Sequence, residues 1–217
     1  MIRHALVRKP GPDAVDGLTS QSGPPLRFGE LQRQHDLYCR QLERLGIRLL
    51  SLDPLSGHPD AYFVEDTAIV TPETAIITRP GASQRRGEVQ SVASVLADHR
   101  PLETIQAPGT LDGGDVLIVS DHVFVGLSHR TNRQGADQLA RILKPYGYRF
   151  TSVAVTDGLH LKSSVNSMGD DCLLILAPWA QRPEFEGYHK LGVPPEEAHA
   201  CNTLAINGHL IMPAGYP

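Results

Sequence analysis

The sequence predicts a modular α/β fold in which short strands alternate with amphipathic helices. Apolar runs of strand length are separated by segments whose apolar residues recur at helical spacing. The order strand, hairpin, helix also returns at intervals of roughly 50 to 60 residues, which favours repeats arranged around an axis or in a row. With 217 residues and no stretch suited to a linker, residues 1–217 are expected to form a single domain.

The first expected unit is a strand at 4–9, a loop rich in Gly, Pro and Ser, and a helix over 30–45. Leu31, Leu42 and their neighbours on one face recur at helical spacing, and Gly46 follows as a C-cap. The same reasoning along the chain gives the remaining elements. Strands are expected at 47–53, 67–71, 74–80, 102–106, 116–120, 122–128, 149–155, 159–166, 171–177, 201–207 and 209–215, and helices at 88–98 and 132–144.

Composition and charge argue against several classes of protein. A net charge of −4 with scattered basic residues argues against nucleic acid as a partner. Three widely spaced cysteines, Cys39, Cys172 and Cys201, do not suit a disulfide framework or a zinc site, and a reducing cytoplasm is the simplest compartment. The N-terminal stretch is too charged for a signal peptide, and no apolar run approaches the roughly 18 residues that span a bilayer.

The stretch "HPDAYFVEDTAIV" (58–70) places Asp60, Glu65 and Asp66 in or beside an apolar run. Surface acids on a strand are one interpretation. Adjacent residues of a strand point to opposite faces, however, so either Glu65 or Asp66 would face the interior or a cleft. A buried carboxylate needs a cationic partner, because its desolvation is costly.

The stretch "PGTLDGGDVLI" (108–118) has two interpretations as well. Asp112 and Asp115 can cap backbone amides in a Gly-rich turn. Alternatively, the glycines allow a close approach of the backbone to a ligand, and Asp112 points into a site.

Three basic side chains are further candidates. His160 lies between Leu159 and Leu161 in the expected strand 159–166, where it is either a hydrogen-bonded core residue or an acid–base group. Arg85 and Arg130 each lie between a strand and a helix in consecutive units. They are either solvated charges or a pair that converges on one anion, and arginine suits a carboxylate. No histidine pair has metal-binding spacing, so no metal site is expected.

Together these stretches resemble the dimethylarginine dimethylaminohydrolases of the amidinotransferase/arginine deiminase superfamily. The segments that carry the resemblance span the chain in family order. They are "VDGLTS" (15–20), "FVEDTAIV" (63–70), "AIITRPGASQRRGE" (75–88), "APGTLDGGDVL" (107–117), "VGLSHRTNRQGA" (125–136), "LHLKSS" (159–164) and "GHLIMPAGYP" (208–217). The resemblance implies an α/β fold of the pentein type, a pseudosymmetric five-bladed propeller with the active site in its central channel. It also implies hydrolysis of methylated arginine to citrulline and dimethylamine, without a cofactor.

The resemblance also implies roles for individual residues. His160 looks like the acid–base group, and Asp66 and Asp112 look like the carboxylates that face the substrate guanidinium. Arg85 and Arg130 look like the clamp on the substrate α-carboxylate. Asp60, Glu65 and the backbone of Leu18 look like further substrate contacts. The implied partner is a small methylated arginine, with a homodimer as the assembly and neither nucleic acid nor a membrane as a partner.

The nucleophilic cysteine of the family has no counterpart among the three cysteines of this sequence. Cys201 resembles a structural cysteine at the start of the expected strand 201–207. The last blade is therefore expected to be incomplete, and the nucleophile is expected beyond residue 217. Two alternatives stay open: a non-catalytic protein that binds guanidino ligands, and a related hydrolase or amidinotransferase that acts on another guanidino compound.

Overall fold

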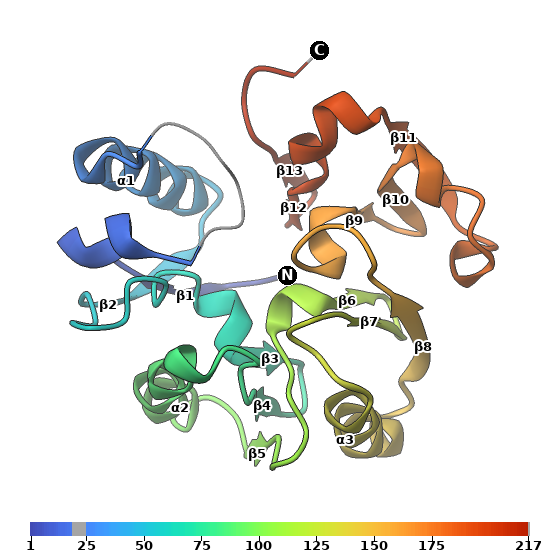
Figure 1. The fold of residues 1–217 in the computed structure, drawn as a ribbon, viewed down its shortest axis with the longest axis horizontal. Coiled ribbons are helices and arrows are strands. Elements are labelled where there is room, and N and C mark those ends of the chain that lie inside the picture. The colour runs from blue at the N-terminus through green and yellow to red at the C-terminus, as the bar shows by residue number, and fades with distance from the viewer. Residues whose placement is uncertain (19–24, 217) are drawn as a thin grey trace.

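The described residues of this computed structural model, 1–18 and 25–216, form five small β-sheets arranged around a common centre (Figure 1). The end of the "VDGLTS" stretch and the last residue of the "GHLIMPAGYP" stretch lie outside the described residues. Helices lie on the outer side of the sheets in the same view. This arrangement agrees with the modular α/β fold that the sequence predicts.

The three middle sheets repeat one topology. In each, the central strand is antiparallel to the strand before it and parallel to the strand after it. The strands are β3 (Ala68–Val70), β4 (Ala75–Ile77) and β5 (Leu102–Thr104); β6 (Val116–Val119), β7 (His122–Leu127) and β8 (Arg149–Ala154); and β9 (Val165–Gly169), β10 (Cys172–Leu176) and β11 (His189–Val193). A parallel neighbour requires a crossover, which α2 (Val89–Leu96) and α3 (Arg133–Leu143) provide in the first two of these sheets.

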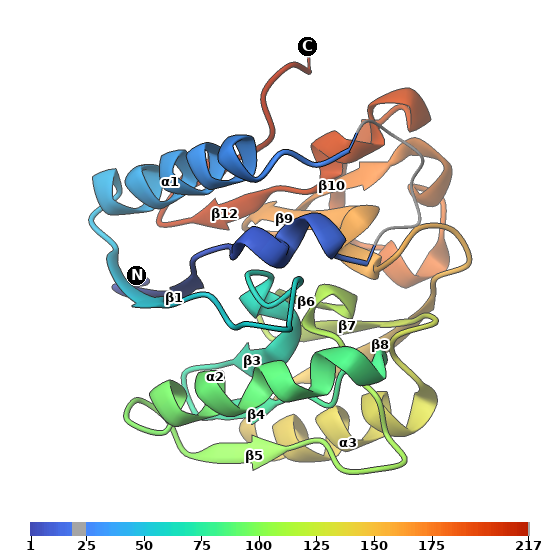
Figure 2. The same cartoon turned by 60° about the vertical axis from the view of Figure 1, so that its left-hand side comes forward.

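The first and last sheets each hold two strands among the described residues. β1 (His4–Arg8) and β2 (Arg48–Leu52) are parallel and joined by α1 (Phe28–Arg44), whereas β12 (Leu204–Ile206) and β13 (His209–Ile211) form an antiparallel hairpin. These two sheets lie side by side beneath α1 (Figures 1 and 2). The Ile2 backbone N–H donates to the Asn207 side chain at 2.8 Å, and the Asn207 amide donates back to the Ile2 carbonyl at 2.8 Å.

Burial of apolar side chains joins each sheet to the next. Ile76 of β4 and Val123 of β7 share one buried cluster, and Phe124 of β7 shares another with Ile175 of β10. Most of these residues are β-branched or aromatic, the types that pack well on a pleated surface. None of the helices in the part of the chain that the structure describes is long and apolar enough to cross a membrane.

The prediction of a strand over 159–166 is wrong in its first half. His160 lies in a loop, Leu161–Ser163 form a 3-10 turn, and β9 begins only at Val165. The Leu161 backbone N–H donates to the Asp115 side chain at 2.9 Å and has no strand as its partner. Leu161 is fully buried while Leu159 is exposed, so the alternation of these leucines comes from a loop that dips into the core.

The acidic pair at 65–66 does not lie on a strand either. Val64–Thr67 form a 3-10 helix, preceded by a turn in which the Phe63 N–H donates to the Asp60 carbonyl. The inference that one of the two acids faces the interior is confirmed, because Asp66 is buried and Glu65 is exposed. Two further differences concern the C-terminal region: β11 was not expected, and Cys201 ends a 3-10 helix at Pro195–Cys201 instead of starting a strand.

Candidate active site

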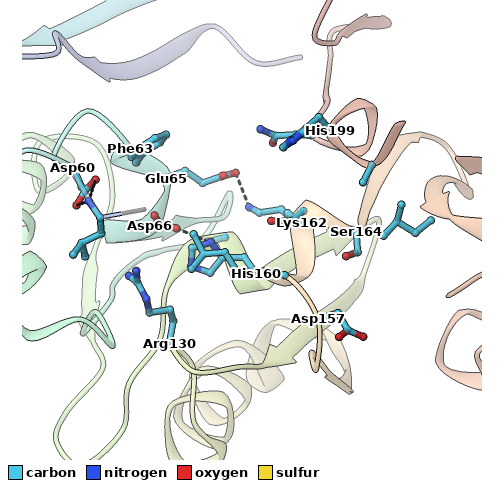
Figure 3. A pocket seen from close by; sticks show the side chains of 18 of the residues that line it. Asp60, Phe63, Glu65, Asp66, Arg130, Asp157, His160, Lys162, Ser164 and His199 are labelled. Atoms are coloured by element: carbon cyan, nitrogen blue, oxygen red, sulfur yellow. Dashed lines mark hydrogen bonds and ion pairs between the residues drawn. The ribbon is translucent and has the colours of Figure 1, made fainter. Parts of the chain in front are cut away.

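A cavity of about 630 Å³ opens near the centre of the molecule. Seven of the eight residues that the sequence singles out line it, and Figure 3 shows several of them converging from different sheets. The seven are Leu18, Asp60, Glu65, Asp66, Arg85, Arg130 and His160. The eighth, Asp112, is fully buried behind the cavity wall and contacts His160.

Asp66 is held from two sides. Arg85 donates from Nη1 to Asp66 Oδ2 at 2.5 Å, and the Gly114 backbone N–H donates to Asp66 Oδ1 at 2.9 Å. Burial alone would raise the pKa of Asp66, but His160 and Arg85 together hold that pKa below its usual value. The buried carboxylate at the cavity wall is therefore kept ionised.

Arg85 is itself buried and almost completely engaged by the protein. Its Nε donates to Glu88, and its Nη2 donates to Glu88 at 2.8 Å and to the carbonyls of Asp60 and Phe63. Burial works against the charge of Arg85, but these contacts with Glu88 and Asp66 outweigh it and raise the pKa of the guanidinium further. Because removal of one member of a buried ion pair typically costs about 3–5 kcal/mol, this group stabilises the cavity wall.

His160 lies against Asp112, with 3.1 Å between His160 Nε2 and Asp112 Oδ2. Burial opposes protonation of the imidazole, yet the hydrogen bond to Asp112 and the nearby charges of Asp66 and Asp115 raise the pKa of His160 above its ordinary value. A histidine that borders a cavity can both donate and accept a proton there.

Two glycines make the close approach around His160 possible. A Cβ on Gly114 would lie 2.7 Å from His160 Nδ1, and a Cβ on Gly113 would overlap the Glu65 carbonyl. Any larger residue would push these elements apart. Of the two interpretations of the "PGTLDGGDVLI" stretch, the first is confirmed, because Asp112 Oδ1 accepts from the Gly81 backbone N–H and Asp115 Oδ1 from the Leu161 backbone N–H, both at 2.9 Å. The glycines allow a close approach between protein segments, and Asp112 does not line the cavity.

Arg130 extends into the cavity from the loop after β7 (Figure 3). Among the described residues, the Arg130 guanidinium makes one hydrogen bond, from Nη1 to Asp112 Oδ2 at 3.3 Å. The Arg130 side chain is 14% exposed, compared with 4% for Arg85. Of the two predicted clamp residues, Arg130 therefore has the greater donor capacity directed at the cavity.

The two remaining predicted acids differ in their surroundings. Asp60 is buried, and both of its carboxylate oxygens accept from the Leu18 backbone N–H, at 3.2 and 3.0 Å. Glu65 pairs with Lys162 Nζ at 2.5 Å across the cavity, as the dashed line in Figure 3 marks.

Sequence reasoning missed several residues of the cavity. Lys162 stands two positions after His160 in the quoted "LHLKSS" stretch and could have been found there. Ser164, the last residue of the same stretch, also lines the cavity, as do Asp157, His199 and Asn202, which had no local signal.

The three cysteines lie outside the cavity lining. Cys201 is fully buried, and burial raises the pKa of its thiol to about 11, so it remains protonated at neutral pH.

Asp66, Asp112 and His160 form a group with metal-ligand atoms within 4.8 Å of one another. Two cations already neutralise this group, because Arg85 contacts Asp66 and Arg130 contacts Asp112. These carboxylates suit a planar cation that donates hydrogen bonds to them better than they suit a divalent ion in addition to two arginines.

Five sheets around a centre, with ionised carboxylates, a histidine and an arginine at a shared cavity, define a pentein-type α/β protein with a polar central site. The chain belongs to the arginine deiminase family, as a member of its dimethylarginine dimethylaminohydrolases. The family model for arginine deiminase matches residues 51–177. The dimethylarginine dimethylaminohydrolase of Pseudomonas aeruginosa is 37% identical over all of this chain and 86% of its own length, and that of Streptomyces coelicolor is 36% identical over 99% of this chain and 83% of its own.

Solved structures agree with this assignment. The Pseudomonas aeruginosa enzyme, as a cysteine-to-serine mutant with citrulline, superimposes with a TM-score of 0.97 over all of this chain and 86% of that chain at 37% identity. An amidinotransferase from Microseira wollei is 13% identical with a TM-score of 0.78 over 97% of this chain and 82% of its own, which shows the shared fold. These matches give no support to the expectation of a truncated last blade.

Proposed function

We propose that this protein hydrolyses Nω-methylated arginines to citrulline and a methylated amine. The observation that carries the proposal is that ionised Asp66 and the protonatable His160 meet at one cavity, with buried Asp112 hydrogen-bonded to His160 from behind the cavity wall. Carboxylates suit a planar guanidinium, and the histidine suits a leaving group that needs a proton. The names of the two relatives at 36–37% identity, and the citrulline bound to one of them, support the same reaction.

In the first step, a cysteine thiolate attacks the guanidinium carbon and forms a carbon–sulfur bond. The bond from that carbon to the dimethylated nitrogen breaks, and dimethylamine leaves with a proton from His160. Asp66 faces the guanidinium from the cavity wall and fixes its plane, and Asp112 behind that wall orients His160. Such positioning raises the rate because the reacting atoms meet in one geometry.

In the second step, neutral His160 takes a proton from water, which attacks the same carbon. The carbon–sulfur bond breaks, the thiolate is restored and citrulline is released. One residue thus serves first as acid and then as base, which requires a pKa near the working pH. The charges around His160 shift its pKa upward and so favour the proton donor in the resting protein.

The remaining lining residues bind the amino acid part of the substrate in this proposal. Arg130, and Arg85 through the donor capacity that Asp66 and Glu88 leave, hold the α-carboxylate. Leu18, Asp60 and Glu65 complete the substrate contacts. The substrate is a small molecule, and no cofactor takes part in either step.

The position of the nucleophile beyond residue 217 stays a prediction. The matching Pseudomonas aeruginosa protein was solved as a cysteine-to-serine mutant with citrulline bound, which supports a functional role for that cysteine in the relative. Because Cys39, Cys172 and Cys201 do not line the cavity, a non-catalytic binder of guanidino ligands is the second candidate function.

The test is turnover by the purified full chain with asymmetric dimethylarginine, monomethylarginine and arginine, with citrulline and amine release measured. We expect citrulline from the methylated substrates and a lower kcat/KM for arginine. Calorimetric binding of dimethylarginine or citrulline without any turnover would select the binder. Preferred turnover of another guanidino compound would select the related hydrolase or amidinotransferase.

Compartment and assembly are proposals of the same kind. We expect the protein in the cytoplasm, as a homodimer, without nucleic acid or membrane partners. Cell fractionation and light scattering coupled to size exclusion check these expectations.

A further inference from the structure

Asp115 is a fully buried carboxylate that does not line the cavity. Burial raises the pKa of the Asp115 carboxyl above its usual value, and the hydrogen bonds that both of its oxygens accept oppose that rise. Space for it comes from Gly126 of β7, because a Cβ there would lie 2.8 Å from Asp115 Oδ1. An acid that is buried at this position and contacts no substrate needs a structural or positional reason.

The first hydrogen bond reaches the loop that carries His160. Asp115 Oδ1 accepts from the Leu161 backbone N–H at 2.9 Å. Leu161 directly follows His160, and its side chain is anchored in the core that β6, β7 and β10 share. The bond therefore fixes the backbone from which the imidazole extends toward Asp112.

The second hydrogen bond reaches the loop that carries Arg130. Ser128 Oγ donates to Asp115 Oδ2 at 2.6 Å. The same hydroxyl accepts from the backbone N–H groups of Arg130 at 3.0 Å and Thr131 at 3.2 Å. Ser128 thus links Asp115 by hydrogen bonds to the turn from which the Arg130 side chain enters the cavity.

We propose that Asp115, with Ser128, is a positioning residue that holds the His160 loop and the Arg130 loop in fixed relation through one buried carboxylate. This inference rests on the proposed function for the roles of His160 and Arg130. Two loops more than 30 residues apart in the sequence would otherwise be free to move separately, and a displacement of about 1 Å can lower a rate by on the order of 100-fold.

The charge of Asp115 also acts on His160. The charged groups that act on this imidazole are Asp66 from the 3-10 helix at 64–67 and Asp112 and Asp115 from the loop before β6. Two cations line the same cavity and pair with other acids: Arg130, from the loop after β7, pairs with Asp112, and Lys162, from the turn after His160, pairs with Glu65. The three acids favour imidazolium. Neutralising Asp115 removes one of the three, so the His160 pKa is expected to fall.

The experiment compares Asp115→Asn with Ser128→Ala in the purified full chain. Two readouts are followed: the His160 pKa by NMR titration, assigned with His160→Gln, and kcat and KM for dimethylarginine. Asp115→Asn should lower the His160 pKa and reduce kcat by on the order of tenfold or more. Ser128→Ala should leave the His160 pKa in place and raise KM several-fold, and Ser128→Thr should restore KM.

Thr74→Val is the matched control, because it removes a buried hydroxyl that donates to the Pro101 carbonyl far from the cavity lining. It should leave the His160 pKa, kcat and KM unchanged. Unchanged His160 pKa and kcat in Asp115→Asn would overturn the inference. If Asp115→Asn does not fold, Ser128→Ala decides alone, and an unchanged KM overturns the inference. The NMR readout needs no turnover, so a protein inactive on methylated arginines would refute the proposed function and still test the coupling of Asp115 to His160.

Discussion

At the scale of single residues, the cavity depends on charges that the protein places out of water. Asp66, Arg85 and Glu88 form a buried group in which each charge is satisfied by the others. The ion pair with Arg85 offsets the desolvation cost of Asp66, which would otherwise be too large for a buried, ionised carboxylate. Loss of Arg85 leaves two buried carboxylates without their shared cation, so the effect of Arg85 variants on activity has to be measured together with stability.

The pH dependence of turnover should be governed by His160. Its protonated form donates to the leaving amine, and its pKa is raised, so kcat/KM should fall as pH rises through a value above the ordinary pKa of about 6.5. Asp112→Asn removes the hydrogen bond at Nε2 and should move this limb to lower pH. The same raised pKa adds stability below the unfolded pKa, which is lost as pH rises through the folded pKa.

The measurement is a pH–rate profile for the unmodified chain and Asp112→Asn, combined with thermal unfolding at the same pH values. If the alkaline limb stays at the same pH in Asp112→Asn, the hydrogen bond to Asp112 is not the cause of the raised His160 pKa.

Arg130→Lys should raise KM for dimethylarginine about tenfold while kcat changes less. Lysine keeps the charge and loses the planar fork that fits a carboxylate. Tenfold corresponds to about 1.4 kcal/mol, which is within the range for one charge-assisted hydrogen bond. A methylguanidine analogue that lacks the α-carboxylate is the control. Equal losses for both compounds would refute the assignment of Arg130 to the carboxylate.

At the scale of elements, the site is built from loops that start or end strands. The "GTLDGGD" loop passes so close to the 3-10 helix at 64–67 and to His160 that only glycine fits at 113 and 114. Gly114→Ala should therefore displace the imidazole and reduce kcat by on the order of tenfold or more, with a smaller effect on KM. Steady-state kinetics with a melting curve check this. Gly147→Ala is a control of the opposite kind, because that glycine has a positive φ of 89° with open space around it and should cost only stability.

Helix α3 is capped at its N-terminus by the side chain of Asn132. Asn132 Oδ1 accepts from the Gly135 N–H at 2.8 Å, a side-chain N-cap, and from the Thr110 N–H at 3.0 Å. Asn132→Ala should lower the free energy of unfolding by about 0.5–2 kcal/mol. Asn132→Asp retains the acceptor and should recover most of that loss. Urea titration of the three proteins measures both values, and a loss below 0.3 kcal/mol in Asn132→Ala would contradict the capping role.

Most of the repeated helices and strands could be predicted from the sequence, whereas the geometry of the site could not. The regular elements have local patterns, and all three expected helices occur within a few residues of their expected bounds. The loop at His160 does not have such a pattern, because its backbone is fixed by Asp115, 46 positions away. β11 was missed for a related reason: its residues are mostly exposed without alternation, and backbone pairing to β10 holds it.

The candidate residues came from sequence patterns, their roles came from the family resemblance, and their partners came only from the structure. Nothing in the "RRGE" stretch distinguishes Arg85, which is buried against Asp66, from Arg86, which lies outside the cavity lining. Long-range pairs such as Glu65 with Lys162 depend on how the sheets are arranged around the centre, which no local pattern encodes.

At the scale of the whole molecule, apolar clusters connect most of the neighbouring sheets. Leu52 of β2 packs with Ile77 of β4, and corresponding clusters join the later sheets in turn. Leu42 of α1 and Val7 of β1 share a cluster with Ile206 of β12, so the first and last sheets are also in contact. Among the described residues, four of the five clusters span more than one sheet, and the fifth lies within the β9–β11 sheet and the 3-10 helix that follows it. We therefore propose that residues 1–217 unfold as a single domain.

Leu42→Ala tests this proposal, because Leu42 is 1% exposed in the cluster shared by the first and last sheets. A large-to-small change at such a position costs about 2–5 kcal/mol. In a single cooperative unit the loss should lower Tm of the whole transition while calorimetric and van't Hoff enthalpies stay equal. Leu37→Ala, at an exposed position on the same helix, is the matched control and should leave Tm almost unchanged. A second transition that separates from the first in Leu42→Ala would show instead that the first and last sheets unfold independently of the three sheets that carry Asp66, Asp112 and His160.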